Sequence, residues 1–88
     1  MNVKHPATIT GHVVAVKRHG HTVYGNPTMS AVIHLTAIDG VEAVTSTPVT
    51  VRISDNASIV YGIENAEYRE QPHTFALTRA GRISHEVR

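Results

Sequence analysis

Seven histidines are the most unusual feature of this 88-residue chain, because imidazole binds metal ions and titrates near neutral pH. His19 and His21 are separated by one residue, so on an extended chain they point the same way and could together hold a Zn²⁺ or Ni²⁺ ion. A stable site needs a third or fourth ligand, which His12 or His34 would have to supply. The chain has no cysteine and no His-Glu-x-x-His pattern. We therefore favour a polar hairpin tip with exposed histidines over a metal site.

Carboxylates offer the next possible chemistry. Glu64, Glu67 and Glu70 are spaced by three residues in one charged segment, and nothing apolar accompanies them that would raise a carboxylate pKa. No serine or threonine lies in a nucleophile-elbow pattern, and no glycine-rich phosphate loop is present. We therefore expect no catalytic residue, no cofactor and no enzymatic activity.

Basic and aromatic side chains are the best candidates for binding a partner. Eight Lys and Arg against seven Asp and Glu give a formal net charge of +1, which argues against strong electrostatic binding but leaves room for a local basic patch. An aromatic residue beside an arginine on an exposed loop, as at Tyr68 and Arg69, is also typical of interface hot spots. The candidate partner-binding residues are Lys17, Arg18, His19, His21, Tyr24, Arg52, Tyr68, Arg69, Arg79 and Arg82.

The elements that must position these residues are strands. Val, Ile, Thr and Ala dominate the composition, and β-branched residues favour a pleated surface over a helix. The length fits one domain, residues 1–88. Alternating polar and apolar residues predict strands at about 7–18, 29–38, 41–54 (clearest at 49–54), 73–79 and 82–88.

Side-chain alternation also predicts which residues form the core. Ile9, Gly11, Val13 and Ala15 share one face of the first strand, and Gly11 would allow the close approach of another strand. In the other strands we expect Met29, Ala31, Ile33, Leu35, Val49, Val51, Ile53, Phe75, Leu77, Ile83 and Val87 to face inward.

Turns and one short helix complete the expected fold. Residues 17–28 predict a polar hairpin loop, Asp39-Gly40 a tight hairpin, and Ala80-Gly81 the last turn. A helix of one or two turns is expected over 57–61, capped by Ser54, Asp55 or Asn56, with Ile59, Val60 and Tyr61 plugging one end of the core. The charged segment 64–71 should be an exposed loop.

The order strand, strand, strand, short helix, strand, strand is typical of the oligonucleotide/oligosaccharide-binding (OB) barrel. An SH3-like barrel is the alternative, with its short helical turn before the last strand. We therefore expect an all-β domain with one short helix, built as a small five-stranded OB-like barrel.

Two stretches of the chain, Gly25–Thr28 and Ser58–Glu86, carry a recognisable set of spaced residues. They comprise a Gly-Asn-Pro-Thr turn, a tyrosine in a helical turn, an Ile-x-Asn step, a Glu-Tyr pair and a final Thr-Arg-x-Gly-x-Ile hairpin. The residues after the first turn are Tyr61, Ile63, Asn65, Glu67, Tyr68, Thr78, Arg79, Gly81 and Ile83. This pattern resembles small proteins encoded by actinobacteriophages, mycobacteriophages among them. The resemblance implies a phage accessory protein working in the bacterial host cytoplasm, and it carries over no functional residue.

Three kinds of binding follow as hypotheses. The leading one is a non-enzymatic, phage-encoded binding module for a host bacterial protein whose activity it alters. The alternative is an OB-type protein that binds single-stranded DNA or RNA. The third is a homo-oligomer that assembles through an apolar strand edge at 44–49. Residues 1–5 lack the apolar run of a signal peptide, and no stretch approaches the roughly 20 apolar residues of a membrane span, so we expect a cytoplasmic protein.

Overall fold

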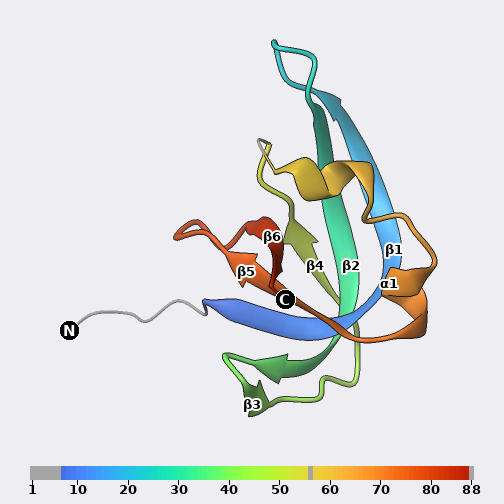
Figure 1. Cartoon of the computed structure of the whole chain (residues 1–88), viewed down its shortest axis with the longest axis vertical. Coiled ribbons are helices and arrows are strands. Elements are labelled where there is room, and N and C mark those ends of the chain that lie inside the picture. Colours follow the sequence, from blue (N-terminus) through green and yellow to red (C-terminus); the bar gives the residue numbers. More distant parts are fainter. Residues whose placement is uncertain (1–6, 56, 88) are drawn as a thin grey trace.

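The structure, a computed structural model, describes residues 7–55 and 57–87. These residues form a single antiparallel sheet with two short helical segments (Figure 1). The strands are β1 (Thr8–His21), β2 (Pro27–Ile38), β3 (Val41–Glu42), β4 (Val49–Arg52), β5 (His73–Leu77) and β6 (Ile83–Val87). The helical segments are the 3₁₀ turn η1 (Ser58–Tyr61) and the α-helical turn α1 (Glu67–Glu70). The predicted all-β class is confirmed. Both helical segments lie between β4 and β5, and none lies directly before the last strand, β6, among the described residues.

The sheet curls but does not close into the barrel expected from the sequence. Its order is β3-β2-β1-β5-β6, and β4 pairs with β2 beside β3. Among the described residues, the two ends of the sheet meet at one parallel bridge between Ile53 and Ile83, where the Ser54 N–H donates to the Ile83 carbonyl at 2.8 Å. After this bridge the chain turns into η1 instead of continuing beside β6, and so the barrel stays open.

The core lies on the inner face of the curled sheet. Ile33, Ile53, Phe75 and Ile83 are completely buried, and Met29 and Val13 are nearly so. The inward positions of β2 alternate as predicted, which confirms the period of two in that strand. The further core residues are Ile9, Ala31, Leu35, Ala57, Val60, Ile63 and Tyr68.

β1 departs from the predicted alternation at a β-bulge. Ile9, Gly11 and Val13 are buried as expected, but the register shifts between Val13 and Ala15. A bulge inserts one extra residue and therefore turns the following side chains to the opposite face. Ala15 consequently lies opposite Val32 and is exposed, so its predicted place in the core is wrong.

Gly11 confirms the predicted close approach of a second strand. A Cβ atom added at Gly11 would lie 2.3 Å from the carbonyl oxygen of His34 and 2.9 Å from the Ile33 side chain. The obstructing oxygen belongs to the backbone of β2, which cannot swing aside as a flexible side chain would. The bend of β1 against β2 therefore requires glycine at this position.

Most of the polar loop expected over 17–28 is strand. β1 continues to His21 and β2 begins at Pro27, so the two strands form a long hairpin arm that rises above the rest of the sheet in Figure 1. Gly20, with φ of 136°, takes up a register shift that lets the pairing continue. The turn itself, residues 22–26, is closed by a bond from the Thr22 N–H to the Asn26 carbonyl at 2.8 Å.

The Asp39-Gly40 turn has the expected hairpin form, with φ of 51° and 78° at the two residues. The Asp39 side chain has a second role that the sequence did not suggest. Its Oδ1 accepts hydrogen bonds from the backbone N–H groups of Ala7 (2.6 Å) and Thr8 (2.9 Å). The turn between β2 and β3 thereby fixes the beginning of β1.

The connection from β3 to β4 replaces the apolar strand edge that was expected at 44–49. Within that range Val49 alone belongs to a strand, and Val44 is exposed. The His34 Nε2–H group donates to the carbonyl of Thr45 at 2.8 Å and so ties the connection to β2. A strand edge for self-assembly is therefore absent from this segment.

The structure exchanges the expected roles of two tyrosines. Tyr61, predicted to plug the core, is 76% exposed, whereas Tyr68, predicted on an exposed loop, is 6% exposed. Val60 in η1 and Ile63 just after it are buried, whereas Tyr61 between them points outward. The segment after it forms α1, which lays the Tyr68 ring 5.9 Å from that of Phe75.

The last strand also differs from its predicted alternation. Ile83 faces inward, but the register with β5 shifts so that Ser84 is an extra residue. Glu86 then lies opposite the core residue Phe75, and Val87 lies opposite Thr74 and is exposed, contrary to the prediction. The predictions for residues 1–5, for a cap at 56 and for a strand end at 88 fall outside the described residues.

Candidate functional site

A row of polar and basic side chains crosses the outer face of the sheet. Lys17 on β1 lies opposite Ser30 on β2, and Ser30 lies opposite Arg52 on β4. Directly opposed residues on neighbouring strands project from the same face. Since Met29 and Ala31 on either side of Ser30 point into the core, the row lies on the outer face.

The turn between β5 and β6 extends this row. Arg52 and Arg82 directly precede the two residues of the parallel bridge, so the bridge brings these arginines to neighbouring positions. The turn is held by bonds from the Thr78 N–H to the Arg82 carbonyl (2.8 Å) and from the Gly81 N–H to the Thr78 carbonyl (2.9 Å). Arg79 and Arg82 are both exposed on it. Residues Lys17, His19, Arg52, Arg79 and Arg82 are called the basic row below.

Arg52 is incompletely compensated within the protein. Its Nη2 lies 3.7 Å from Asp55 Oδ1, which is too long for a good hydrogen bond. Its Nε and the same Asp55 oxygen are buried, and neither has a hydrogen-bond partner among the described residues. Buried polar atoms that lack a partner carry an energetic cost that a suitable ligand or water can relieve. The Arg52 side chain is 40% exposed, so the outer end of its guanidinium is available to an anion.

The histidines and the tyrosine of the hairpin arm lie at the far end of the row. A 2.8 Å hydrogen bond joins His19 Nε2 to Ser30 Oγ, and His21 is exposed at the end of β1. Tyr24 at the tip of the arm is 88% exposed. The structure thus brings these three predicted residues to the same end of the arm.

Three other predicted residues lie apart from the basic row. Arg18 stands opposite the core residue Met29, on the inner side of the arm, and makes an ion pair with Glu64. Tyr68 is buried, so its predicted role as an exposed contact residue is wrong. Arg69 is exposed on α1, with Glu67 and Glu70 in the same turn.

Most acidic side chains among the described residues lie outside the basic row. Glu64, Glu67 and Glu70 are exposed in the segment that contains α1, as predicted for a solvated run. Asp39 and Glu42 lie at the end of β2 remote from Ser30. Among the described acids, Asp55 is the one placed beside the basic row. A near-neutral chain can therefore present a locally positive face.

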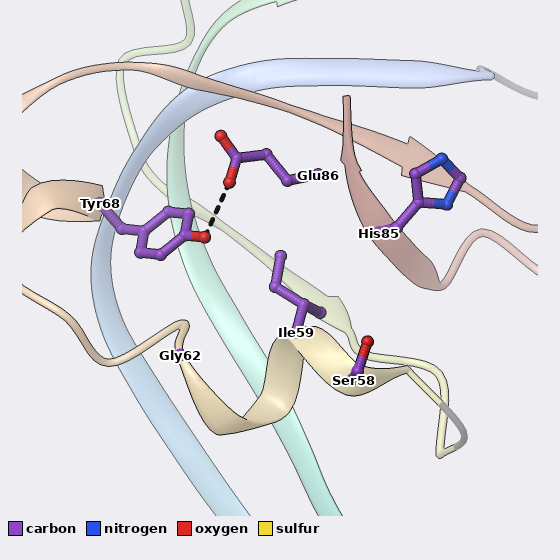
Figure 2. Close-up of a pocket in the computed structure, with 6 residues that line it drawn as sticks. All are labelled: Ser58, Ile59, Gly62, Tyr68, His85 and Glu86. Carbon is purple, nitrogen blue, oxygen red and sulfur yellow. Dashed lines mark hydrogen bonds between the residues drawn. The ribbon is translucent and has the colours of Figure 1, made fainter. Parts of the chain in front are cut away.

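A cavity of about 260 Å³ lies between η1 and β6, where the sheet stays open (Figure 2). Tyr68 and Glu86 reach toward one another across it, and the Tyr68 hydroxyl donates to Glu86 Oε1 at 2.8 Å. Sequence reasoning missed Glu86, because its inward position depends on the extra residue in β6. The cavity is lined by Ser58, Ile59, Gly62, Tyr68, His85 and Glu86.

His73 completes this polar cluster. Its Nδ1–H group donates to Glu86 Oε2 at 2.8 Å, and its Nε2–H group donates to the Glu67 carbonyl at 3.1 Å. Burial lowers the pKa of His73, but the bonds to Glu86 and Glu67 and their charges outweigh burial and raise this pKa above 6.5. Because each ring nitrogen of His73 lies beside a hydrogen-bond acceptor, the geometry suits the protonated ring. These hydrogen bonds join Tyr68 and the Glu67 carbonyl of α1 to His73 on β5 and Glu86 on β6, and so they hold α1 against the sheet.

A metal centre finds no support in the geometry. Within residues 7–55 and 57–87, no three His, Asp or Glu side chains are grouped as metal ligands would be. His19 and His34, two members of the possible ligand set, instead bond to Ser30 and Thr45.

No helix in the described part of the chain is long and apolar enough to cross a membrane. Comparisons of the chain with protein-family models, with curated proteins and with solved structures each found no match.

Proposed function

We propose that the protein is a non-catalytic module that binds single-stranded DNA or RNA across the outer face of its sheet. The observation that supports this proposal most strongly is the row that begins at Lys17 and continues through Arg52 to Arg82. Proteins that bind single strands without sequence preference use aligned positive charges to follow the phosphate backbone.

The place of this row in the fold agrees with the proposal. In OB folds, ligands bind on the face of the second and third strands, between the loop joining strands one and two and the loop joining strands four and five. The corresponding parts here are β2 and β4, the tip of the hairpin arm, and the turn that carries Arg79 and Arg82. Tyr24 at the tip offers one exposed ring on which a base can stack.

Fluorescence anisotropy with labelled oligonucleotides tests the proposal. We expect binding that weakens steeply with salt, because bound phosphates release counterions. Arg52→Gln and Arg82→Gln should each weaken binding and reduce the slope of log K against log salt by about 0.7, the value for one phosphate contact on a single strand. Arg69→Gln is the matched control, since it removes the same charge from α1, away from the row. Absence of binding at low salt, or equal losses in all three variants, would contradict the proposal.

Binding of a host bacterial protein is the second candidate, and the apolar tip of the hairpin arm favours it. Val23 is 94% exposed next to Tyr24, which is 88% exposed, and tyrosine is enriched among the residues that dominate protein–protein interfaces. Under this hypothesis the protein is a phage accessory protein in the host cytoplasm. A host protein recovered by affinity capture should be lost with Val23→Ser and retained with Val41→Ser, which changes an exposed valine elsewhere. Equal recovery by both variants would exclude the tip as the docking site.

A further inference from the structure

A second cavity of about 160 Å³ opens between the base of the hairpin tip and η1. It adjoins the basic row, because Asp55 lines the cavity and also makes the 3.7 Å contact with Arg52. A strand whose phosphates follow the row would therefore pass its entrance. The cavity is lined by Asn26, Asp55, Ala57, Ser58, Val60 and Tyr61.

The shape and composition of this cavity suit a single flat ring system. Its volume is about half of the roughly 300 Å³ at which pockets for drug-sized ligands begin. Ala57 and Val60 are buried core residues and give it an apolar floor. Tyr61, which the sequence placed in the core, is instead largely exposed at its rim and offers a ring for stacking.

Polar groups at the cavity decide which ring fits best. Asp55, whose side chain is 35% exposed, supplies a carboxylate, and Asn26 supplies an amide. A carboxylate accepts hydrogen bonds, and an amide can donate one. Guanine presents two adjacent donors, N1–H and the N2 amino group, beside the acceptor O6. Adenine and cytosine have an acceptor next to their amino group, and thymine and uracil have a carbonyl oxygen on each side of their single N–H. With any of these four bases, an acceptor of the base would face an acceptor of the carboxylate, which is unfavourable.

We propose that this cavity binds one guanine base of a single strand, with the base stacked on Tyr61 and its N1–H and N2 amino group donating to Asp55. The inference rests on the proposed binding of single-stranded nucleic acid and adds a base preference to it. Reading an unstacked base by its Watson–Crick edge and by stacking is the usual way in which proteins recognise single strands.

The test compares oligothymidylates of about 12 nucleotides, within the site sizes of OB folds, that carry one central substitution. The central base is guanine, inosine, 7-deazaguanine or thymine, and affinity is measured by anisotropy at fixed salt. Inosine lacks the N2 amino group, whereas 7-deazaguanine keeps the whole Watson–Crick edge. We expect guanine and 7-deazaguanine to bind equally and inosine about tenfold more weakly, as for the loss of a bond to a charged group. These comparisons use the unaltered protein and need no variant.

Variants then assign the preference to residues. Asp55→Asn should abolish the difference between guanine and inosine, while Glu67→Gln, which removes a carboxylate that does not line the cavity, should preserve it. Tyr61→Leu should weaken binding of the guanine oligonucleotide by at least about fivefold, and Tyr61→Phe should restore it because the ring remains.

The two proposals fail in different ways. If no oligonucleotide binds at low salt, the proposed function fails and the guanine site fails with it. If all four oligonucleotides bind equally, or if Asp55→Asn keeps the difference between guanine and inosine, the guanine site is wrong while binding through the basic row stands.

Discussion

Replacing Glu86 by glutamine would remove the negative charge of this side chain while keeping nearly the same shape. The side chains of Glu86 and His73 are each 17% exposed, so their interaction is weakly screened by solvent. The carboxylate accepts from Tyr68 and His73, and bonds to a charged group contribute about 1.5–3 kcal/mol each, against about 0.5–1.5 kcal/mol for neutral pairs. Glu86→Gln keeps a neutral acceptor, so the expected loss in the free energy of unfolding is about 2 kcal/mol.

This loss should depend on pH in a defined direction. The folded-state pKa of His73 is raised above 6.5, the value expected for the unfolded chain. The stabilisation from its protonated ring is therefore fully present below about pH 6.5 and is lost as the pH rises through the folded-state pKa. Glu86→Gln removes the main partner of that ring. The difference between the two proteins should consequently be larger near pH 6 than near pH 9.

Urea unfolding followed by far-UV circular dichroism measures both quantities, provided that the m-value is unchanged. Glu70→Gln is the matched control, because Glu70 is an exposed acid on the same segment and should change stability by less than about 0.5 kcal/mol. In a protein that already carries His73→Gln, adding Glu86→Gln should change the free energy of unfolding by the same amount near pH 6 and near pH 9. If Glu86→Gln destabilises the protein equally at both pH values, or not at all, the charged cluster does not hold α1 as described.

Two further changes test the backbone. In the same unfolding assay Gly11→Ala should lower the free energy of unfolding by about 3 kcal/mol, because the new Cβ would press on the His34 carbonyl. A decrease of less than about 1 kcal/mol would refute the requirement for glycine. Asp39→Ala should lower the free energy of unfolding by about 2 kcal/mol and speed amide hydrogen exchange at Thr8. Asp39→Asn keeps a side-chain acceptor and tolerates positive φ, so it should lower this free energy less; equal losses would show that the side-chain bonds to β1 are unimportant.

Long runs of strict alternation made the strands predictable. From Met29 to Leu35 every second residue is a buried apolar side chain, and burial of one face fixes such a strand in a unique register. The far part of β1 was not predictable in this way. Its polar residues and Gly20 look like a loop, and pairing with β2 rather than burial keeps them extended.

The candidate site was only partly predictable, for two physical reasons. Within one helical turn too few residues repeat to define a face, so the sequence could not show that η1 exposes Tyr61 or that α1 buries Tyr68. One extra residue in a strand reverses every later side chain, and the shift at Ser84 thereby turned Glu86 inward and Val87 outward. The arginines could be identified as candidates from their residue type alone. Their alignment in a row could not be predicted, because it depends on how the strands pair.

The shared use of β1 has a consequence for the order in which the chain folds. The part of β1 near the arm pairs with β2 through a five-residue turn, whereas Ile9 pairs with Phe75, 66 positions further along the chain. Closing the first contact costs little chain entropy, but the second must wait for a long loop to close. The hairpin arm should therefore form early, and the pairing of β1 with β5 should limit the folding rate. Contacts of the arm are then already formed in the transition state, so mutations that weaken the arm should slow folding at least as much as mutations in β5 do.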